Sequence, residues 1–175
     1  MISRKEALKL VKKCSKCSHL LLASRLMGRL AKRLGECSFE WELVGLLHDL
    51  DFDEVRSDMS RHGVAAAERL KDELPDHCLY ALKAHDYRTG FKPKSRLDHA
   101  LIAVDSLAVL MEEALEEFRE PDIQDLKGKL EELSLGEPWH KSNIRKCREL
   151  GLSIDEFFEL ALVPEKKKLD SEHTH

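Results

Sequence analysis

The chain has 175 residues, a net charge of −4, 42% hydrophobic residues and 6% aromatic residues. This length suits one domain that buries its core without needing disulfide bonds or structural metal ions. The excess of acidic residues excludes a general binder of large nucleic acids, which needs a basic surface. No apolar run reaches membrane-spanning length and the N-terminal segment lacks the apolar centre of a signal peptide, so we expect a cytoplasmic protein with no membrane contact.

The first half of the chain predicts five helices. Ser3 opens a capping box, Gly35 ends the second helix, and Ser38 and Ser60 are candidate N-caps of the third and fourth helices. Pro75 ends the fourth helix. The expected helices cover residues 4–14, 18–34, 39–50, 61–74 and 76–86.

The second half begins with a loop over YRTGFKPKS, which contains Gly90 and Pro93. Ser95 then opens a long helix with an apolar period that ends before Pro121, and Asp122 caps the next helix. Further helices are expected over residues 137–151 and 154–163. The chain is therefore predicted to be an all-α, single-domain bundle of about eight or nine helices over residues 1–163, followed by a charged tail, residues 164–175, that we expect to be disordered.

The five cysteines, an odd number in a chain without an export signal, are expected to be reduced thiols. Cys14 and Cys17 form a CxxC pair, a spacing found in zinc sites and in redox proteins. No second CxxC or Cys/His pair follows at zinc-finger spacing and no βαβ pattern surrounds it, so the sequence disfavours both chemistries there.

Several polar side chains interrupt the apolar faces of these helices. Asp105 has apolar residues three and four positions before and after it, so a helix places its carboxylate on an apolar face. His19 and His85 share their faces with Ala and Leu residues, and the small residues Gly63, Ala65 and Ala66 follow His62. Each residue could also have an ordinary structural role, since a buried acid can pair with a basic residue and an inward histidine is more often a hydrogen-bonded core residue.

His48 and Asp49 are adjacent at the inner end of the apolar segment LVGLLHDLDFD. Burying an imidazole and a carboxylate together is costly unless both are compensated. Gly45 lies one helical turn before them, and because a glycine inside a helix costs about 1 kcal/mol relative to alanine, it suggests that something requires space there. A divalent cation would neutralise the carboxylate and accept the imidazole nitrogen.

Together these residues supply four imidazoles and two carboxylates, a ligand set that suits one or two ions of Fe, Mn, Co, Ni or Zn. Six independently satisfied polar core residues would be unusual in one small domain. The candidate metal ligands are His19, His48, Asp49, His62, His85 and Asp105.

In this order the six residues resemble the HD-domain superfamily of metal-dependent phosphohydrolases, in its branch with two extra histidines. The segments EWELVGLLHDLDFD, RHGVAAAERL, AHDY and LDHALIAVDSLAVL are similar to a stand-alone group of predicted HD-superfamily hydrolases. The resemblance implies that His19, His48, Asp49 and Asp105 hold a first metal ion. It also implies that His62 and His85 hold a second one, and that Asp49 bridges the two ions. Asp51 departs from the commonest variant, which has a glycine at this position.

The resemblance also implies a reaction, in which a metal-bound hydroxide hydrolyses a phosphomonoester or phosphoanhydride of a nucleotide or similar small molecule. His48 and Asp49 would be the catalytic centre, and Lys83 and Arg88 are candidate substrate-binding residues. Two alternatives stay open: a di-iron oxygenase on the same ligand frame, and a non-catalytic regulatory protein that binds a metal or ligand.

Three features of the sequence remain undecided. The role of Asp51 is open, and Asp53 is either a partner of the metal ligands or a loop cap. Trp41 and Trp139 are candidates for core residues or for contacts in a homodimer.

Overall fold

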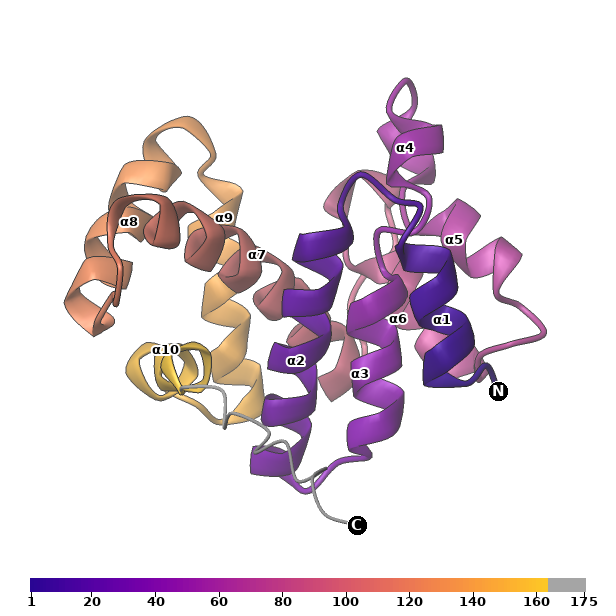
Figure 1. The fold of residues 1–175 in the computed structure, drawn as a ribbon, viewed down its shortest axis with the longest axis horizontal. Helices are drawn as coiled ribbons and strands as arrows, with labels where there is room; N and C mark the ends of the chain where they lie inside the picture. Colours follow the sequence, from indigo (N-terminus) through magenta and orange to yellow (C-terminus); the bar gives the residue numbers. More distant parts are fainter. Residues whose placement is uncertain (164–175) are drawn as a thin grey trace, which may run out of the picture.

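The computed structural model describes residues 1–163, which form an all-helical fold without a strand (Figure 1). The tail predicted to be disordered, residues 164–175, lies outside the described residues. The first part of the fold comprises α1 (Arg4–Val11), α2 (Cys17–Leu34), α3 (Ser38–Leu47), α4 (Phe52–Val55), the 3-10 helix η1 (Met59–Arg61), α5 (Val64–Arg69) and α6 (Asp76–Ala84). The second comprises η2 (Tyr87–Thr89), α7 (Arg96–Glu117), α8 (Ile123–Gly136), α9 (Trp139–Ile144), η3 (Arg145–Leu150) and α10 (Ile154–Leu162).

The predicted bundle of eight or nine helices is confirmed. Apart from α4, which is a single turn of four residues, the described part of the chain contains nine α-helices. None of the helices within residues 1–163 is long and apolar enough to cross a membrane.

Helix α7 joins the two parts of the fold. Figure 1 shows α2 and α3 side by side, with α1 and α6 near α3, while α8, α9 and α10 gather at the far end of α7. The fully buried side chains Leu20, Leu47, Leu101 and Phe157 come from α2, α3, α7 and α10 and belong to one continuous core. Trp41 also lies in this core, whereas Trp139 is 40% exposed.

The helix boundaries confirm most of the predicted caps. Capping boxes open α1 at Ser3, α7 at Ser95 and α8 at Asp122, each with the side chain accepting a hydrogen bond from a backbone N–H of the first turn. The prediction for Ser38 is wrong, because Cys37 is the N-cap of α3 and Ser38 is its first residue. The prediction for Ser60 is also wrong, because this residue lies within η1 and the next helix begins after Gly63. His62 is consequently not in the first turn of a helix but in the connection that precedes one.

The structure confirms that space is required at Gly45 and shows what occupies it. A Cβ atom at this position would lie 2.8 Å from the carbonyl oxygen of Ala23 and 2.8 Å from Cγ of Met27, both in α2. The space above this turn is therefore filled by the neighbouring helix, and glycine allows α2 and α3 to pack closely.

Candidate metal centre

The six candidate ligands come from five places in the sequence and meet in one region of the fold. His19 lies in the first turn of α2, His48 and Asp49 follow α3, His62 precedes α5, His85 follows α6, and Asp105 lies within α7. Their ligand atoms form two groups, each within 4.8 Å: His19, His48, Asp49 and Asp105 in the first, and Asp49, His62 and His85 in the second. These buried groups can hold a metal ion.

The first group is arranged around the carboxylate of Asp105. Its Oδ1 lies 3.0 Å from Nε2 of His19 and 3.4 Å from Nε2 of His48. Nε2 of His48 also lies 3.2 Å from Oδ1 of Asp49. Both imidazoles thus present the same nitrogen to the carboxylates.

The second group shares Asp49 with the first. The Oδ1 atom of Asp49 lies 3.0 Å from Nε2 of His62 and 3.4 Å from Nε2 of His85. The same oxygen therefore faces imidazoles of both groups, which is the position of a bridging ligand.

Backbone carbonyls fix the orientation of two of the rings. Nδ1 of His48 lies 2.9 Å from the carbonyl oxygen of Gly45, and Nδ1 of His85 lies 2.7 Å from that of Leu82. Because a carbonyl can only accept, the hydrogen sits on Nδ1 in both rings and Nε2 faces the cluster. This arrangement is typical of metal-ligating histidines.

The carboxylate of Asp51 fixes the orientation of the His62 ring. Its Oδ1 accepts a hydrogen bond from Nδ1 of His62 at 2.9 Å, and its Oδ2 accepts from the backbone N–H groups of Gly63 and Ala66, both at 2.8 Å. The side chain is completely buried. The role left open by the sequence is therefore that of a positioning residue, which also caps the start of α5.

Glu112 orients the fourth imidazole and was missed by sequence reasoning. Its Oε2 lies 3.2 Å from Nδ1 of His19. The residue follows Asp105 by seven positions in α7, so two helical turns place both carboxylates on one face. That spacing is the signal that could have identified it.

The free nitrogens of the cluster fit a bound cation. Nε2 of His48 is buried and, within residues 1–163, makes no hydrogen bond of acceptable geometry. Nε2 of His62 and Nε2 of His85 face each other at 3.3 Å while each Nδ1 is engaged behind the ring. These nitrogens require a proton or a metal ion between them, because two lone pairs cannot hydrogen-bond to each other.

The charges in the cluster favour a cation as well. Burial lowers the pKa of His19 and of His62, but hydrogen bonds to two carboxylates outweigh it in each case and raise both pKa values to about 10. Burial raises the pKa of the Asp49 and Asp105 carboxyls, but the neighbouring imidazoles lower both well below the usual range. Both carboxylates are therefore ionised and able to bind a metal ion.

A cavity of about 380 Å³ opens onto the cluster, a size that suits a small molecule. Its wall includes the charged side chains of Lys16, Asp86, Arg88, Glu113 and Glu137, the aromatic rings of Phe52, Tyr87 and Trp139, and the polar groups of Ser106, His140 and Asn143. The cavity therefore offers both charged and stacking surfaces.

The two predicted substrate-binding residues are placed differently. Arg88 lines the cavity, where its Nε donates to both carboxylate oxygens of Asp86 at 2.9 and 3.0 Å. Lys83 is not part of this wall, and its Nζ lies 5.8 Å from the ring centroid of Phe91. Of these two residues, only Arg88 lines the same cavity as the candidate metal ligands.

Helix α9 supplies a further part of the wall that sequence reasoning missed. The Ser106 hydroxyl accepts a hydrogen bond from Nδ2 of Asn143 at 3.1 Å and lies 3.1 Å from Nδ1 of His140, whose Nε2 is 2.7 Å from Oε2 of Glu137. Both nitrogens of His140 are thus engaged, which makes it a positioning residue. Nothing in the local sequence places α9 over the cluster.

Asp53 does not belong to either group of candidate metal ligands. Its carboxylate accepts hydrogen bonds from the backbone N–H and hydroxyl of Ser15, at 2.8 and 2.5 Å, and from Nη2 of Arg56 at 2.7 Å. Of the two roles left open by the sequence, the structure supports that of a residue that fastens a loop.

A third group within residues 1–163, formed by Glu40, His77 and Cys78, brings three ligand types together near the surface. Burial raises the pKa of the Cys78 thiol to about 12, so the thiolate needed for metal binding is disfavoured. The two groups that share Asp49 are better suited to a metal ion.

Comparisons of the chain with protein-family models, curated proteins and solved structures found no match. The fold and the site define an all-helical protein with a buried cluster of histidines and aspartates that can hold a metal ion.

Proposed function

We propose that the protein is a metal-dependent phosphohydrolase that cleaves a phosphomonoester or phosphoanhydride of a nucleotide-like small molecule. The observation that carries this proposal is the convergence of four imidazole Nε2 atoms and two carboxylates in one cluster beside a cavity, with each Nδ1 held from behind. The resemblance of the same six residues to the HD-domain superfamily supports the choice of reaction.

The ligand groups divide between two metal positions. His19, His48, Asp49 and Asp105 would hold one ion, and His62, His85 and the shared Asp49 would hold the other. Bound divalent ions supply a water of lowered pKa and offset negative charge on phosphoryl oxygens. Fe, Mn, Co, Ni and Zn all suit this donor set.

Residues in the cavity wall bind and orient the substrate. Arg88 is the first candidate for a phosphate contact, because its guanidinium is in the cavity wall and Asp86 fixes its direction. Lys16 lies in the same wall, with its Nζ 4.8 Å from the ring centroid of Phe52. Lys83 has the weaker claim because it lies outside this wall.

The experiment that tests the proposal measures metal content and phosphate release together. Purified protein is analysed for metal per chain and incubated with nucleotides and dinucleoside polyphosphates in the presence of Mn, Co, Ni or Fe. Asp49→Ala is expected to lose metal and activity, because it removes the oxygen shared by both groups. Asp72→Ala, a change at an exposed carboxylate, is the matched control. Full metal content and activity in Asp49→Ala would contradict the proposal.

A di-iron oxygenase is a second candidate on the same frame, since the Oδ1 of Asp49 faces imidazoles of both groups as a carboxylate bridging two irons would. Consumption of oxygen with a reducing substrate, without phosphate release, would favour it. A non-catalytic regulatory protein would show no turnover with either class of substrate, and its ligand affinity would be unchanged in the double variant His62→Ala, His85→Ala.

A further inference from the structure

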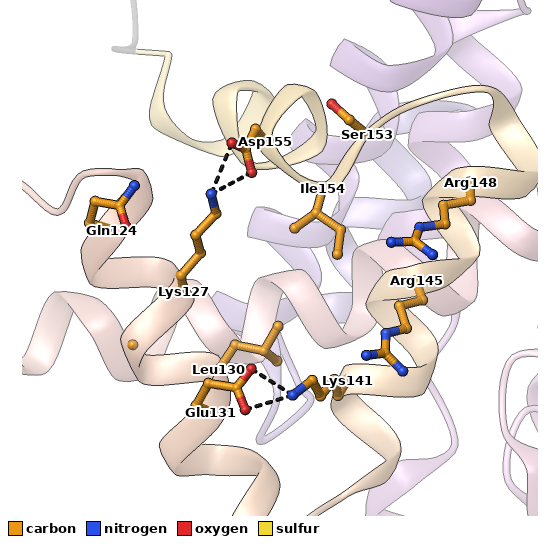
Figure 2. A pocket seen from close by; sticks show the side chains of 11 residues that line it. Gln124, Lys127, Leu130, Glu131, Lys141, Arg145, Arg148, Ser153, Ile154 and Asp155 are labelled. Atoms are coloured by element: carbon orange, nitrogen blue, oxygen red, sulfur yellow. Dashed lines mark hydrogen bonds and ion pairs between the residues drawn. The ribbon is translucent and has the colours of Figure 1, made fainter.

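A second and larger hollow lies between α8, η3 and α10, away from the metal ligands (Figure 2). This groove has a volume of about 880 Å³. Its floor includes the apolar side chains of Leu130 and Ile154, and its walls carry four basic residues: Lys127, Lys141, Arg145 and Arg148. None of these residues belongs to the proposed metal centre.

The two lysines of the groove are already neutralised. Nζ of Lys127 lies 2.8 Å from Oδ1 and 2.9 Å from Oδ2 of Asp155, and Nζ of Lys141 lies 2.6 Å from both carboxylate oxygens of Glu131. Figure 2 shows these two pairs on opposite walls of the groove. These ion pairs hold the walls in place, and the net positive charge of the groove therefore comes from its two arginines.

Arg145 and Arg148 have no such partner. Within residues 1–163 neither guanidinium makes a hydrogen bond or an ion pair, and both side chains are exposed. Figure 2 shows both reaching from η3 toward the groove. In a 3-10 helix, side chains three positions apart are eclipsed, so two like charges lie on the same face and repel each other.

Most arginines elsewhere on the surface of residues 1–163 are paired. Arg4 lies 2.6 Å from Glu42, Arg61 lies 2.6 Å from Glu68, and Arg96 lies 2.7 Å from Glu36. The chain has 33 acidic residues against 29 basic ones, so carboxylates are plentiful. Two adjacent unpaired guanidiniums beside an apolar floor are therefore an uncommon feature of this surface.

We propose that this groove binds an organic phosphate, with its phosphoryl oxygens held by Arg145 and Arg148 and its apolar part lying on Ile154. The planar guanidinium group donates two parallel hydrogen bonds to a phosphate, and two such groups match the charge of a phosphate dianion. Leu130 and Ile154 provide the contact for the organic portion. The site is independent of the proposed hydrolase function.

The test is a titration of the full chain with phenylphosphonate, which has a phosphoryl dianion and an apolar ring but no ester bond to hydrolyse. Amide chemical shifts recorded by NMR are expected to change at η3 and at the start of α10. The double variant Arg145→Gln, Arg148→Gln is expected to bind at least about tenfold more weakly, because charge-assisted hydrogen bonds are lost.

Four further variants distinguish binding in this groove from binding at the metal centre and from attraction to surface charge alone. Arg119→Gln removes an exposed arginine outside the groove and is expected to bind normally. Ile154→Ala is expected to weaken binding of phenylphosphonate but not of inorganic phosphate, since only the former has an apolar part. Asp49→Ala is expected to retain the shifts at η3, which excludes the metal centre as their source. The double variant Arg145→Lys, Arg148→Lys keeps the charge but loses the planar fork, and is expected to bind weakly.

Unchanged affinity of the Arg145→Gln, Arg148→Gln variant, with an unchanged thermal midpoint that shows it is folded, would overturn the proposal. Shifts confined to the residues around the metal cluster would overturn it as well, because the ligand would then occupy the other cavity.

Discussion

The Nε2 atoms of His62 and His85 face each other at 3.3 Å although the two residues lie in different connections of the fold. Asp51 holds the first ring through Nδ1 at 2.9 Å, and the carbonyl oxygen of Leu82 holds the second at 2.7 Å. Neither ring can turn away without losing a buried hydrogen bond. A cation between the two rings would relieve the contact between their nitrogens.

We expect the double variant His62→Ala, His85→Ala to bind less metal than the wild type but to retain some. The change removes two of the three residues of the second group and leaves His19, His48 and the carboxylates of the first group in place. Metal per chain after dialysis measures the effect. Asp72→Ala, which removes an exposed carboxylate outside all of these ligand groups, should leave metal content unchanged. A double variant with the metal content of the wild type would show that these imidazoles hold no ion.

Removal of metal should lower the thermal midpoint of the wild type. An ion that binds only the folded protein stabilises it by about 2.7 kcal/mol when its free concentration is about 100 times the Kd. For a chain of this size that corresponds to a loss of about 5–10 °C on chelation. Thermal unfolding with and without EDTA measures the shift. Asp49→Ala should respond little to EDTA, and an equal response would place the stabilising ion elsewhere.

Asp51→Asn and Asp53→Asn form a matched pair within one segment. Asn at position 51 cannot accept from all three donors and places an amide N–H among them, which is expected to cost about 1–3 kcal/mol. Loss of the partner of His62 should also weaken metal binding by about 10- to 100-fold. Asp53 is partly exposed and bonded to a loop, so its change should cost about 1 kcal/mol or less.

Denaturant unfolding and metal titration distinguish the two variants. Equal effects of Asp51→Asn and Asp53→Asn on metal affinity would mean that the buried carboxylate does not orient a ligand.

The candidate ligands could be identified from the sequence as one group. The apolar period around Asp105 predicted that its carboxylate faces inward, and the position of His48 and Asp49 at the end of a buried segment predicted the same for them. His48 and Asp49 are buried, whereas the Asp105 side chain, which faces His19 and His48, is 26% exposed. These expectations depended on local helical periodicity, which tertiary packing preserved. The capping boxes at Ser3 and Ser95 were predictable for the same reason, because all their atoms lie within one turn.

Features that depend on contacts between distant segments could not be predicted. The role of Asp51 became clear only when His62 and the start of α5 were placed against it. The sequence indicated that space is required at Gly45 but not what fills it, because it does not show that α2 crosses at that turn. The wall contributed by His140 depends on the path of α9 across α7, which no local pattern encodes.

Gly63→Ala should disturb both the fold and the metal site. Gly63 has a φ of 77°, which costs other residues about 1–2 kcal/mol. An added Cβ would also overlap the carbonyl oxygen of Leu82 and lie 2.9 Å from Nδ1 of His85. Gly90→Ala is the control, because Gly90 has a φ of 79° but open space around its Cα.

The difference between the two glycine variants isolates the steric effect. Gly63→Ala should unfold at lower denaturant concentration than Gly90→Ala and should bind less metal, since His62 and His85 are pushed apart. Equal stability and equal metal content of the two variants would show that the close approach at Gly63 is unimportant.

Arg88→Gln and Lys83→Gln test which basic residue contacts the substrate. Arg88 lines the cavity beside the metal cluster, whereas Lys83 lies outside that wall near Phe91. On a substrate found by the phosphate-release screen, Arg88→Gln is expected to lower kcat/KM by about tenfold or more, because a charge-assisted hydrogen bond to phosphate is worth about 1.5–3 kcal/mol. Lys83→Gln should change kcat/KM by less than about twofold, within the range expected for surface substitutions. A larger loss in Lys83→Gln than in Arg88→Gln would mean that the substrate reaches the metal ions from the side of Phe91.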